Sequence, residues 1–142
     1  MDMNSLLHDG KYIGFLATVD EIGHPHVRPI VCLVSEGKIF FSTKDGSRKA
    51  KEIAMNTSAE ITIPVFVDEK FNYLRVSGKA LRIVEESFIV ERLTLSKYSP
   101  GQYIRMRESD ITLMYELLPN QVEQYIPDEK REENITGKFF NR

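Results

Sequence analysis

Residues 12–43 read YIGFLATVDEIGHPHVRPIVCLVSEGKIFFST. Aromatic and β-branched residues fill three runs, Tyr12–Val19, His26–Val34 and Ile39–Thr43, and this composition is typical of β-strands. The intervening DEIGHP and SEGK segments carry the Gly and Pro residues that mark tight turns. Strands joined by tight turns pair antiparallel. We therefore predict that the first two runs are antiparallel partners.

The rest of the chain adds further strands and helices. Ala59–Val67 and Asn72–Val84 have strand composition, and Gly78 is expected at a bend or bulge. The sequence predicts helices at Ser47–Asn56, with Ser47 as the N-cap, and at Glu86–Lys97. A last hairpin is expected from Ile111–Leu118 and Gln121–Ile126, turning at Pro119-Asn120. Many short strands with tight turns indicate a closed or nearly closed antiparallel barrel with two or more accessory helices.

The composition limits the class of protein. The chain has 142 residues, which suits one domain, and a net charge of −2, which does not favour nucleic-acid binding. Its single cysteine, Cys32, lies in an apolar run and is expected to be a buried small side chain. No secretory signal or run of membrane-spanning length is visible, so we expect a cytoplasmic protein without a membrane partner.

The segment STKDGSRK, residues 42–49, is the strongest candidate for a binding site. Ser42 and Thr43 place two hydroxyls at a strand end, and Ser47 caps the following helix. Free N–H groups at a helix N-terminus bind phosphate, and Arg48 or Lys49 would neutralise its charge. Cations in a first helical turn oppose the helix dipole, and an anion bound there would relieve that conflict. The alternative interpretation is an ordinary exposed basic helix start.

Arg28 lies within an otherwise apolar strand, where a buried arginine needs a partner. A ligand phosphate and an internal carboxylate are equally good candidates. Of the three histidines only His24 and His26 are close in sequence, so no metal site is expected. No motif of a nucleophilic or nucleotide-binding enzyme is present, and catalytic residues are unknown.

Several segments, taken in order, resemble the pyridoxamine 5′-phosphate oxidase-like FMN-binding split-barrel family. They are FLATVD (15–20), GHP (23–25), VRPI (27–30), FST (41–43), SRK (47–49), VSGKA (76–80) and LMYELLP (113–119). The resemblance covers about residues 10–126. It implies a mainly β fold, a six-stranded antiparallel split β-barrel, that forms a homodimer with FMN in grooves between the subunits. Residues 1–126 would form the FMN-binding domain and residues 127–142 a polar, solvated C-terminal tail.

The resemblance also implies which residues hold FMN. Arg28 and the strand after it, Pro29, Ile30 and Val31, would lie along the isoalloxazine and phosphate side. Ser42 and Thr43 would contact the flavin or its ribityl chain. Arg48 and Lys49 would hold the phosphate at the helix start capped by Ser47. Tyr73 stands near a position where oxidase members carry a polar flavin contact, so the sequence departs from the family there.

A second departure concerns activity. True pyridoxamine phosphate oxidases are longer and carry an Arg-Trp-Arg type segment for substrate, whereas this chain has no tryptophan. Vitamin oxidase activity is therefore not expected. The resemblance implies a flavin-dependent oxidoreductase acting on an unidentified small molecule. The alternative is a non-enzymatic flavin- or haem-binding module in storage, sensing or stress response. A small barrel that binds single-stranded nucleic acid by stacking is disfavoured by the acidic balance.

Overall fold

A computed structural model describes residues 7–84 and 112–137 of the chain. Its strands are β1 (Gly10–Val19), β2 (Pro25–Ser35), β3 (Lys38–Lys44), β4 (Ser58–Val67), β5 (Lys70–Ile83), β6 (Thr112–Ile126) and β7 (Arg131–Asn134). One α-helix, α2 (Arg48–Met55), lies between β3 and β4. The predicted helix at Glu86–Lys97 lies outside the described residues.

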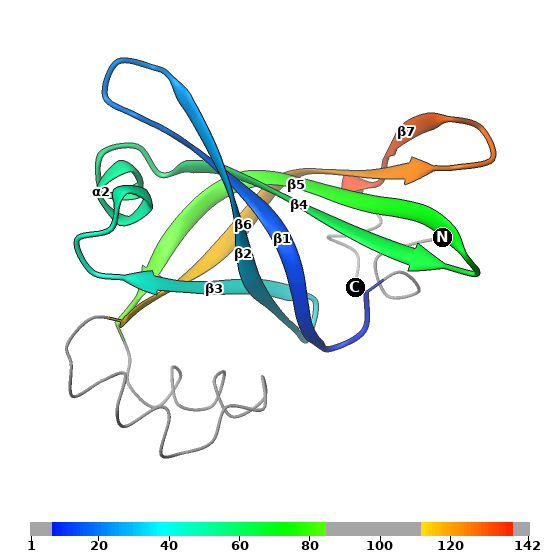
Figure 1. Ribbon diagram of the computed structural model, residues 1–142, viewed down its shortest axis with the longest axis horizontal. Coiled ribbons are helices and arrows are strands. Elements are labelled where there is room, and N and C mark those ends of the chain that lie inside the picture. Colours follow the sequence, from blue (N-terminus) through cyan, green and yellow to red (C-terminus); the bar gives the residue numbers. More distant parts are fainter. Residues whose placement is uncertain (1–6, 85–111, 138–142) are drawn as a thin grey trace.

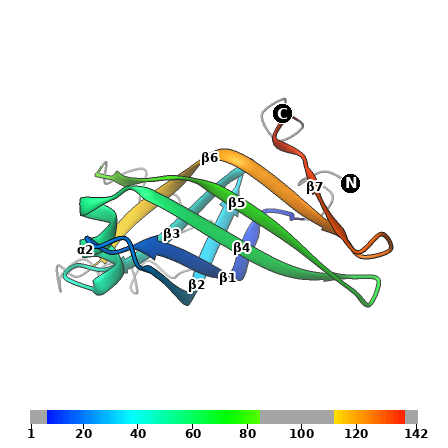
Figure 2. The same ribbon diagram turned by 90° about the horizontal axis from the view of Figure 1, so that it is seen from above.

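The strands form an antiparallel sheet in the order β3-β2-β1-β4-β5-β6-β7, and β3 also pairs with β6. This additional pairing closes β1 to β6 into a six-stranded barrel, and it confirms the predicted mainly β architecture. Figures 1 and 2 show α2 at one end of the barrel and the β4–β5 and β6–β7 turns at the other. Among the described residues, no helix is long and apolar enough to span a membrane.

The first hairpin forms as predicted. β1 and β2 are antiparallel, with Leu16 opposite Arg28 and Phe15 opposite Pro29. β3 pairs with β2 only from Cys32 to Ser35, so Pro29 lies where β2 forms a sheet edge among the described residues. Proline is tolerated there because its missing N–H removes no ladder hydrogen bond.

Helix α2 also begins and ends where the sequence predicts. Ser47 is the N-cap, and its Oγ accepts a hydrogen bond from Ala50 N at 3.2 Å. Asn56 is the C-cap. The buried side of the helix carries Ala50, Glu52 and Ile53, so a carboxylate is packed against the barrel together with two apolar side chains.

The predicted hairpin at Pro119-Asn120 is wrong. Residues 112–126 form one continuous strand, β6, which runs past the proline. Its register with β5 shifts between Ser77, opposite Gln121, and Gly78, opposite Pro119, so Asn120 is the extra residue of a bulge. Gly78 makes the bulge feasible, because a Cβ at this position would lie 1.8 Å from the Leu118 carbonyl oxygen. The predicted irregularity at Gly78 is thus confirmed.

Part of the segment after Pro127 belongs to the sheet. β7 pairs antiparallel with β6, and Ile135 is 1% exposed within the hydrophobic core. The expectation that this segment is solvated is therefore wrong for Ile135. Cys32 is fully buried in the same core, as predicted, and burial raises the pKa of its thiol to about 12.

Candidate functional site

Arg28 lies on the inner face of β2 and is held by the protein itself. Its Nη1 donates to Thr18 Oγ1 at 2.6 Å and to the Leu16 and His26 carbonyl oxygens. Its Nη2 donates to Glu52 Oε2 at 3.2 Å. An internal carboxylate, one of the two partners that the sequence leaves open, therefore pairs with Arg28.

Glu52 is the centre of this charged network. Its side chain is 6% exposed and pairs with Arg28 of β2 and Arg48 of its own helix. Burial opposes its ionisation, but hydrogen bonds from Thr18 and Arg28 outweigh burial, so the pKa of Glu52 lies below its usual range. Glu52 is thus a buried, ionised anchor between α2 and the first hairpin.

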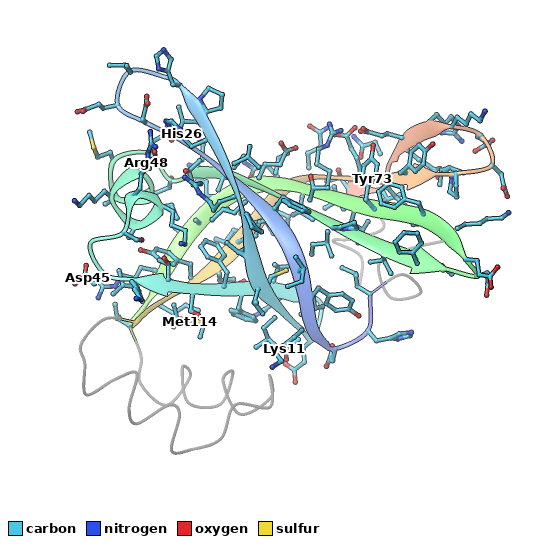
Figure 3. All side chains as sticks on the ribbon, viewed as in Figure 1. Lys11, His26, Asp45, Arg48, Tyr73 and Met114 are labelled. Atoms are coloured by element: carbon cyan, nitrogen blue, oxygen red, sulfur yellow. The ribbon has the colours of Figure 1, made fainter. Side chains whose placement is uncertain are left out.

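His26 joins the network to the β1–β2 turn. Its Nε2 lies 2.8 Å from Arg48 Nη2 and 2.9 Å from Asp20 Oδ2. An unprotonated Nε2 can only accept, and a protonated one can only donate, so these two hydrogen bonds are alternatives. The hydrogen bond with His26, aided by backbone N–H groups of His24 and Ile22, lowers the pKa of Asp20 to about 2. Figure 3 shows His26 and Arg48 together at the α2 end of the barrel.

The start of α2 lies beside this network. Thr43 Oγ1 and Ser47 Oγ are 3.0 Å apart, which connects the end of β3 to the helix cap. The Ser47 side chain satisfies the N–H of Ala50, which leaves the N–H groups of Arg48 and Lys49 without intrahelical partners. Arg48 pairs with Glu52 at 3.1 Å, whereas Lys49 forms no ion pair within residues 7–84 and 112–137.

The remaining predicted site residues divide between two faces of the sheet. Ile30 shares the inner face with Arg28 and is buried, whereas Pro29 and Val31 point outward and are exposed. Ser42 is half-buried on β3 opposite Met114 of β6. The structure therefore gathers Arg28, Ser47 and Arg48 at one end of the barrel and leaves Pro29 and Val31 on its outer surface.

The outer face of the first hairpin is apolar from Ile13 to Val19 and from Pro25 to Val31. Cross-strand pairs place Ile13 beside Val31, Phe15 beside Pro29 and Ala17 beside Val27. Four large side chains of this face are exposed: Ile13, Phe15, Val27 and Val31, with Val27 exposed by 66%. Contiguous exposed apolar surface of this kind marks an interaction site in many proteins.

A shallow groove of about 400 Å³ opens next to this face. Thr18, Val19 and Pro25 line one side, and Glu60, Ser77 and Asn120 line the other. Thr18 also donates to Glu52, so the groove borders the charged network directly. Cationic, hydroxyl and apolar groups thus adjoin at the α2 end of the barrel.

These residues fit a phosphate-bearing ligand at the helix start. The two free N–H groups and the Lys49 ammonium are the donors that a phosphate takes at a helix N-terminus. Arg28 and Arg48 contribute positive charge, but Glu52 already binds both of them. Within the described residues, no group of three metal-ligating side chains is present.

Sequence reasoning missed four members of the network: Thr18, Asp20, His26 and Glu52. Two signals were available. Glu52 follows Arg48 by four positions, the spacing of a helical ion pair. His26 precedes Arg28 by two positions and therefore shares its strand face.

Tyr73 lies far from this site. Its ring stacks on Tyr125 with centroids 5.1 Å apart, and its hydroxyl donates to Glu132 at 2.7 Å. Figure 3 shows Tyr73 toward the end of the barrel opposite α2. Tyr73 therefore does not contribute to the cluster at the helix start.

The fold agrees with the comparisons to known proteins. The family model described as pyridoxamine 5′-phosphate oxidase matches residues 4–124, and the chain belongs to this family. No curated protein matches the sequence.

Solved structures share the fold at low sequence identity. A heme binding protein from Mycobacterium smegmatis superimposes with a TM-score of 0.74 at 18% identity, over 91% of this chain and 54% of that one. A protein from Clostridium acetobutylicum related to general stress protein 26 gives 0.67 at 16% identity, over 90% and 88%. A FAD-binding protein from Mesorhizobium loti gives 0.62 at 13% identity, over 80% and 82%. The chain thus spans about half the length of the mycobacterial protein.

Proposed function

We propose that the protein binds FMN, with the phosphate at the start of α2, and acts as a flavin-dependent oxidoreductase on a small molecule. The observation that carries the proposal is the helix start, where Lys49 and two free N–H groups adjoin the Thr43 and Ser47 hydroxyls. Family membership and the similarity to a FAD-binding protein support a flavin as the ligand.

Each group at this site has a distinct role in the proposal. The N–H groups of Arg48 and Lys49 are fixed by the helix and need no rearrangement to receive a phosphate. The Lys49 ammonium adds a charge-assisted hydrogen bond. Glu52 holds Arg28 in place, so Arg28 acts mainly as fixed positive charge behind the phosphate.

The flavin ring needs more surface than this protomer offers. Ligand pockets bury most of the ligand surface, and the groove beside Thr18 is shallow. We propose that a second copy of the chain packs on the apolar outer face of β1 and β2 and completes the pocket. A two-fold arrangement would bury both copies of Ile13, Phe15, Val27 and Val31 in one self-complementary contact.

A bound flavin supplies the electron or hydride transfer. The protein's own residues bind the phosphate and exclude water from the ring. Among proteins of this fold is an F420 reductase, matched at a TM-score of 0.62. This likeness supports reductive chemistry on a flavin-like cofactor as the type of reaction.

The test begins with the absorbance spectrum of the purified protein and continues with titrations of FMN, F420 and haemin. The proposal expects a flavin spectrum and FMN binding tighter than that of the other two compounds. Anaerobic reduction of the bound flavin by NADH or NADPH would then support an oxidoreductase. A Soret band with preferred haemin binding would establish the haem-binding alternative instead, and binding of none of the three would overturn the proposal.

A further inference from the structure

The Nε2 atom of His26 has two hydrogen-bond partners that it cannot keep at the same time. It lies 2.8 Å from Arg48 Nη2 and 2.9 Å from Asp20 Oδ2. A guanidinium N–H only donates, so the contact with Arg48 requires Nε2 to be unprotonated. A carboxylate only accepts, so the contact with Asp20 requires a proton on Nε2. The protonation state of His26 therefore decides which of the two contacts forms.

Asp20 stays in place in either state. Its Oδ1 accepts hydrogen bonds from the backbone N–H groups of Ile22 at 3.0 Å and His24 at 2.9 Å. The hydrogen bond with His26, together with these backbone contacts, lowers the pKa of Asp20 to about 2. The carboxylate is thus ionised throughout the pH range in which histidine side chains titrate, and a protonated His26 always meets a charged acceptor.

Arg48 loses more when His26 takes up a proton. Its Nε donates to Glu52 Oε1 at 3.1 Å, but among the described residues His26 is the one hydrogen-bond partner of its Nη atoms. The Arg48 side chain is 66% exposed, so these atoms have room to turn. Arg48 is also the first residue of α2, and its backbone N–H is one of the two free donors at the helix start. Its side chain is therefore attached at the proposed phosphate site itself.

The other charged groups around His26 come from both elements that pack against it. On α2, Glu52 Oε1 lies 3.7 Å from His26 Nε2, near enough to attract an imidazolium. On β2, the Arg28 guanidinium donates to the His26 carbonyl oxygen and itself pairs with Glu52. In the turn, the exposed His24 lies 3.9 Å from Asp20 Oδ2 and competes weakly for that carboxylate. A proton on His26 thus meets two carboxylates as well as two guanidinium groups.

We propose that His26 is a positioning residue for Arg48, which it binds when neutral and releases when protonated. In the released state His26 donates to Asp20, and the Arg48 Nη groups are free to bind an anion at the start of α2. This inference rests on the proposed function, because the anion at that site is the FMN phosphate. It adds a regulation of the same site, since FMN should bind more tightly once His26 is protonated.

The exchange of partners is tested first in the protein without ligand. NMR follows the His26 ring and the Arg48 Nε–H between about pH 8 and about pH 5, the range in which histidine titrates. We expect one common midpoint for both signals in the wild type. In His26→Gln the Arg48 transition should be absent, because glutamine has separate donor and acceptor atoms and does not titrate. The control His24→Gln removes the exposed neighbouring histidine and should leave the transition unchanged.

FMN titrations test the consequence for the site. The FMN phosphate itself gains a proton near about pH 6, so the wild type is compared with His26→Gln at each pH. We expect the ratio of their FMN affinities to rise about fivefold from about pH 8 to about pH 5.5, the effect of one added surface ion pair. With Arg48→Met in both proteins the rise should disappear. A rise that persists would mean that the imidazolium acts on the phosphate directly, and it would overturn the role of Arg48.

Asp20→Asn provides a second variant that leaves His26 in place. It removes the carboxylate that receives the protonated ring and should lower the midpoint of the Arg48 transition. An unchanged midpoint would overturn the proposal, as would an Arg48 signal that does not follow His26 in the wild type, or an affinity ratio that stays constant with pH. If the wild type binds no FMN, the proposed function fails, while the NMR titration still decides whether His26 exchanges Arg48 for Asp20.

Discussion

Arg28 of β2 and Glu52 of α2 form the ion pair that joins the helix to the barrel, with Nη2 and Oε2 3.2 Å apart. The side chains are 19% and 6% exposed, so both charges are largely withdrawn from water. A pair of this kind is costly to break on one side, because the remaining charge stays buried without its partner. The position of the helix start, and of any ligand there, therefore depends on Glu52.

We expect Glu52→Ala to lower the free energy of unfolding by about 3 kcal/mol, because it leaves the Arg28 guanidinium without its carboxylate. Urea denaturation measures the change. Lys51→Ala, at an exposed position of the same helix, is the control and should change stability little. Equal stability of the two variants would show that the ion pair does not anchor α2.

Low pH should lower the stability that the carboxylates of Asp20 and Glu52 contribute. The pKa of Asp20 falls from 3.8 to about 2 because of its hydrogen bond with His26, and that of Glu52 is also lowered. A carboxyl group whose pKa is lower in the folded state than in the unfolded state stabilises the fold. This stabilisation is complete at pH values above the unfolded-state pKa and is lost as pH falls through the folded-state pKa. For Asp20 this window runs from about pH 4 to about pH 2. Denaturation at stepped pH should show a shallower acid loss for Asp20→Asn than for the wild type; identical profiles would refute the assignment.

Lys49→Ala should weaken FMN binding by about tenfold or more, because it removes a charge-assisted contact to the phosphate. Riboflavin has the same ring but no phosphate, so its affinity should hardly change. Fluorescence titration with both flavins measures the difference, and Lys51→Ala is the matched lysine control. If the wild type binds FMN and riboflavin equally well, the phosphate does not lie at the helix start.

Val31→Asp should convert a dimer into a monomer, because it places a charge at the centre of the apolar β1–β2 face. Light scattering at micromolar concentration reports the oligomeric state. Phe66→Asp tests the same change on β4, at a side chain that is 73% exposed and outside this face. The proposal fails if the wild type is a monomer with flavin bound, or if Phe66→Asp dissociates the dimer and Val31→Asp does not.

Gly78→Ala should destabilise the barrel by about 1–3 kcal/mol, the usual cost of overpacking, because its Cβ would meet the Leu118 backbone carbonyl. A shift of the urea midpoint measures this change. Gly137→Ala has open space at the corresponding position and serves as the control. A wild-type midpoint for Gly78→Ala would mean that the bulge can relax without cost.

The local patterns of the sequence predict most of the barrel. Strand composition and turn residues identify β1 to β5, and the Ser47 hydroxyl marks the start of α2 because capping is a local interaction. This reasoning from local patterns fails at Pro119-Asn120. A proline and an asparagine predict a turn, but the bulge against Gly78 accommodates both within β6. Whether β6 turns or continues at this point depends on its pairing with β5, a strand that is distant in sequence.

The candidate site likewise has residues that the sequence predicts and residues that it does not. Ser47, Arg48 and Lys49 are found from sequence because they are adjacent in one helix turn. Glu52 is the partner of Arg28 only because α2 packs against β1 and β3, and no local pattern specifies that contact.

Closure of the barrel depends on pairing between β3 and β6, two strands that are synthesised at different times because they are far apart in sequence. β3 ends at Lys44, whereas its partner β6 begins only at Thr112. A nascent chain that has not yet reached β6 leaves β3 as an open edge, with Ile39 and Phe41 without their partners Leu117 and Tyr115. Open edges invite pairing with other chains, and such long-range pairing is slow to form. Aggregation during synthesis should therefore depend on how quickly β6 is synthesised after β3. A chain stopped before residue 112 should leave the β3 edge open to pairing with other chains.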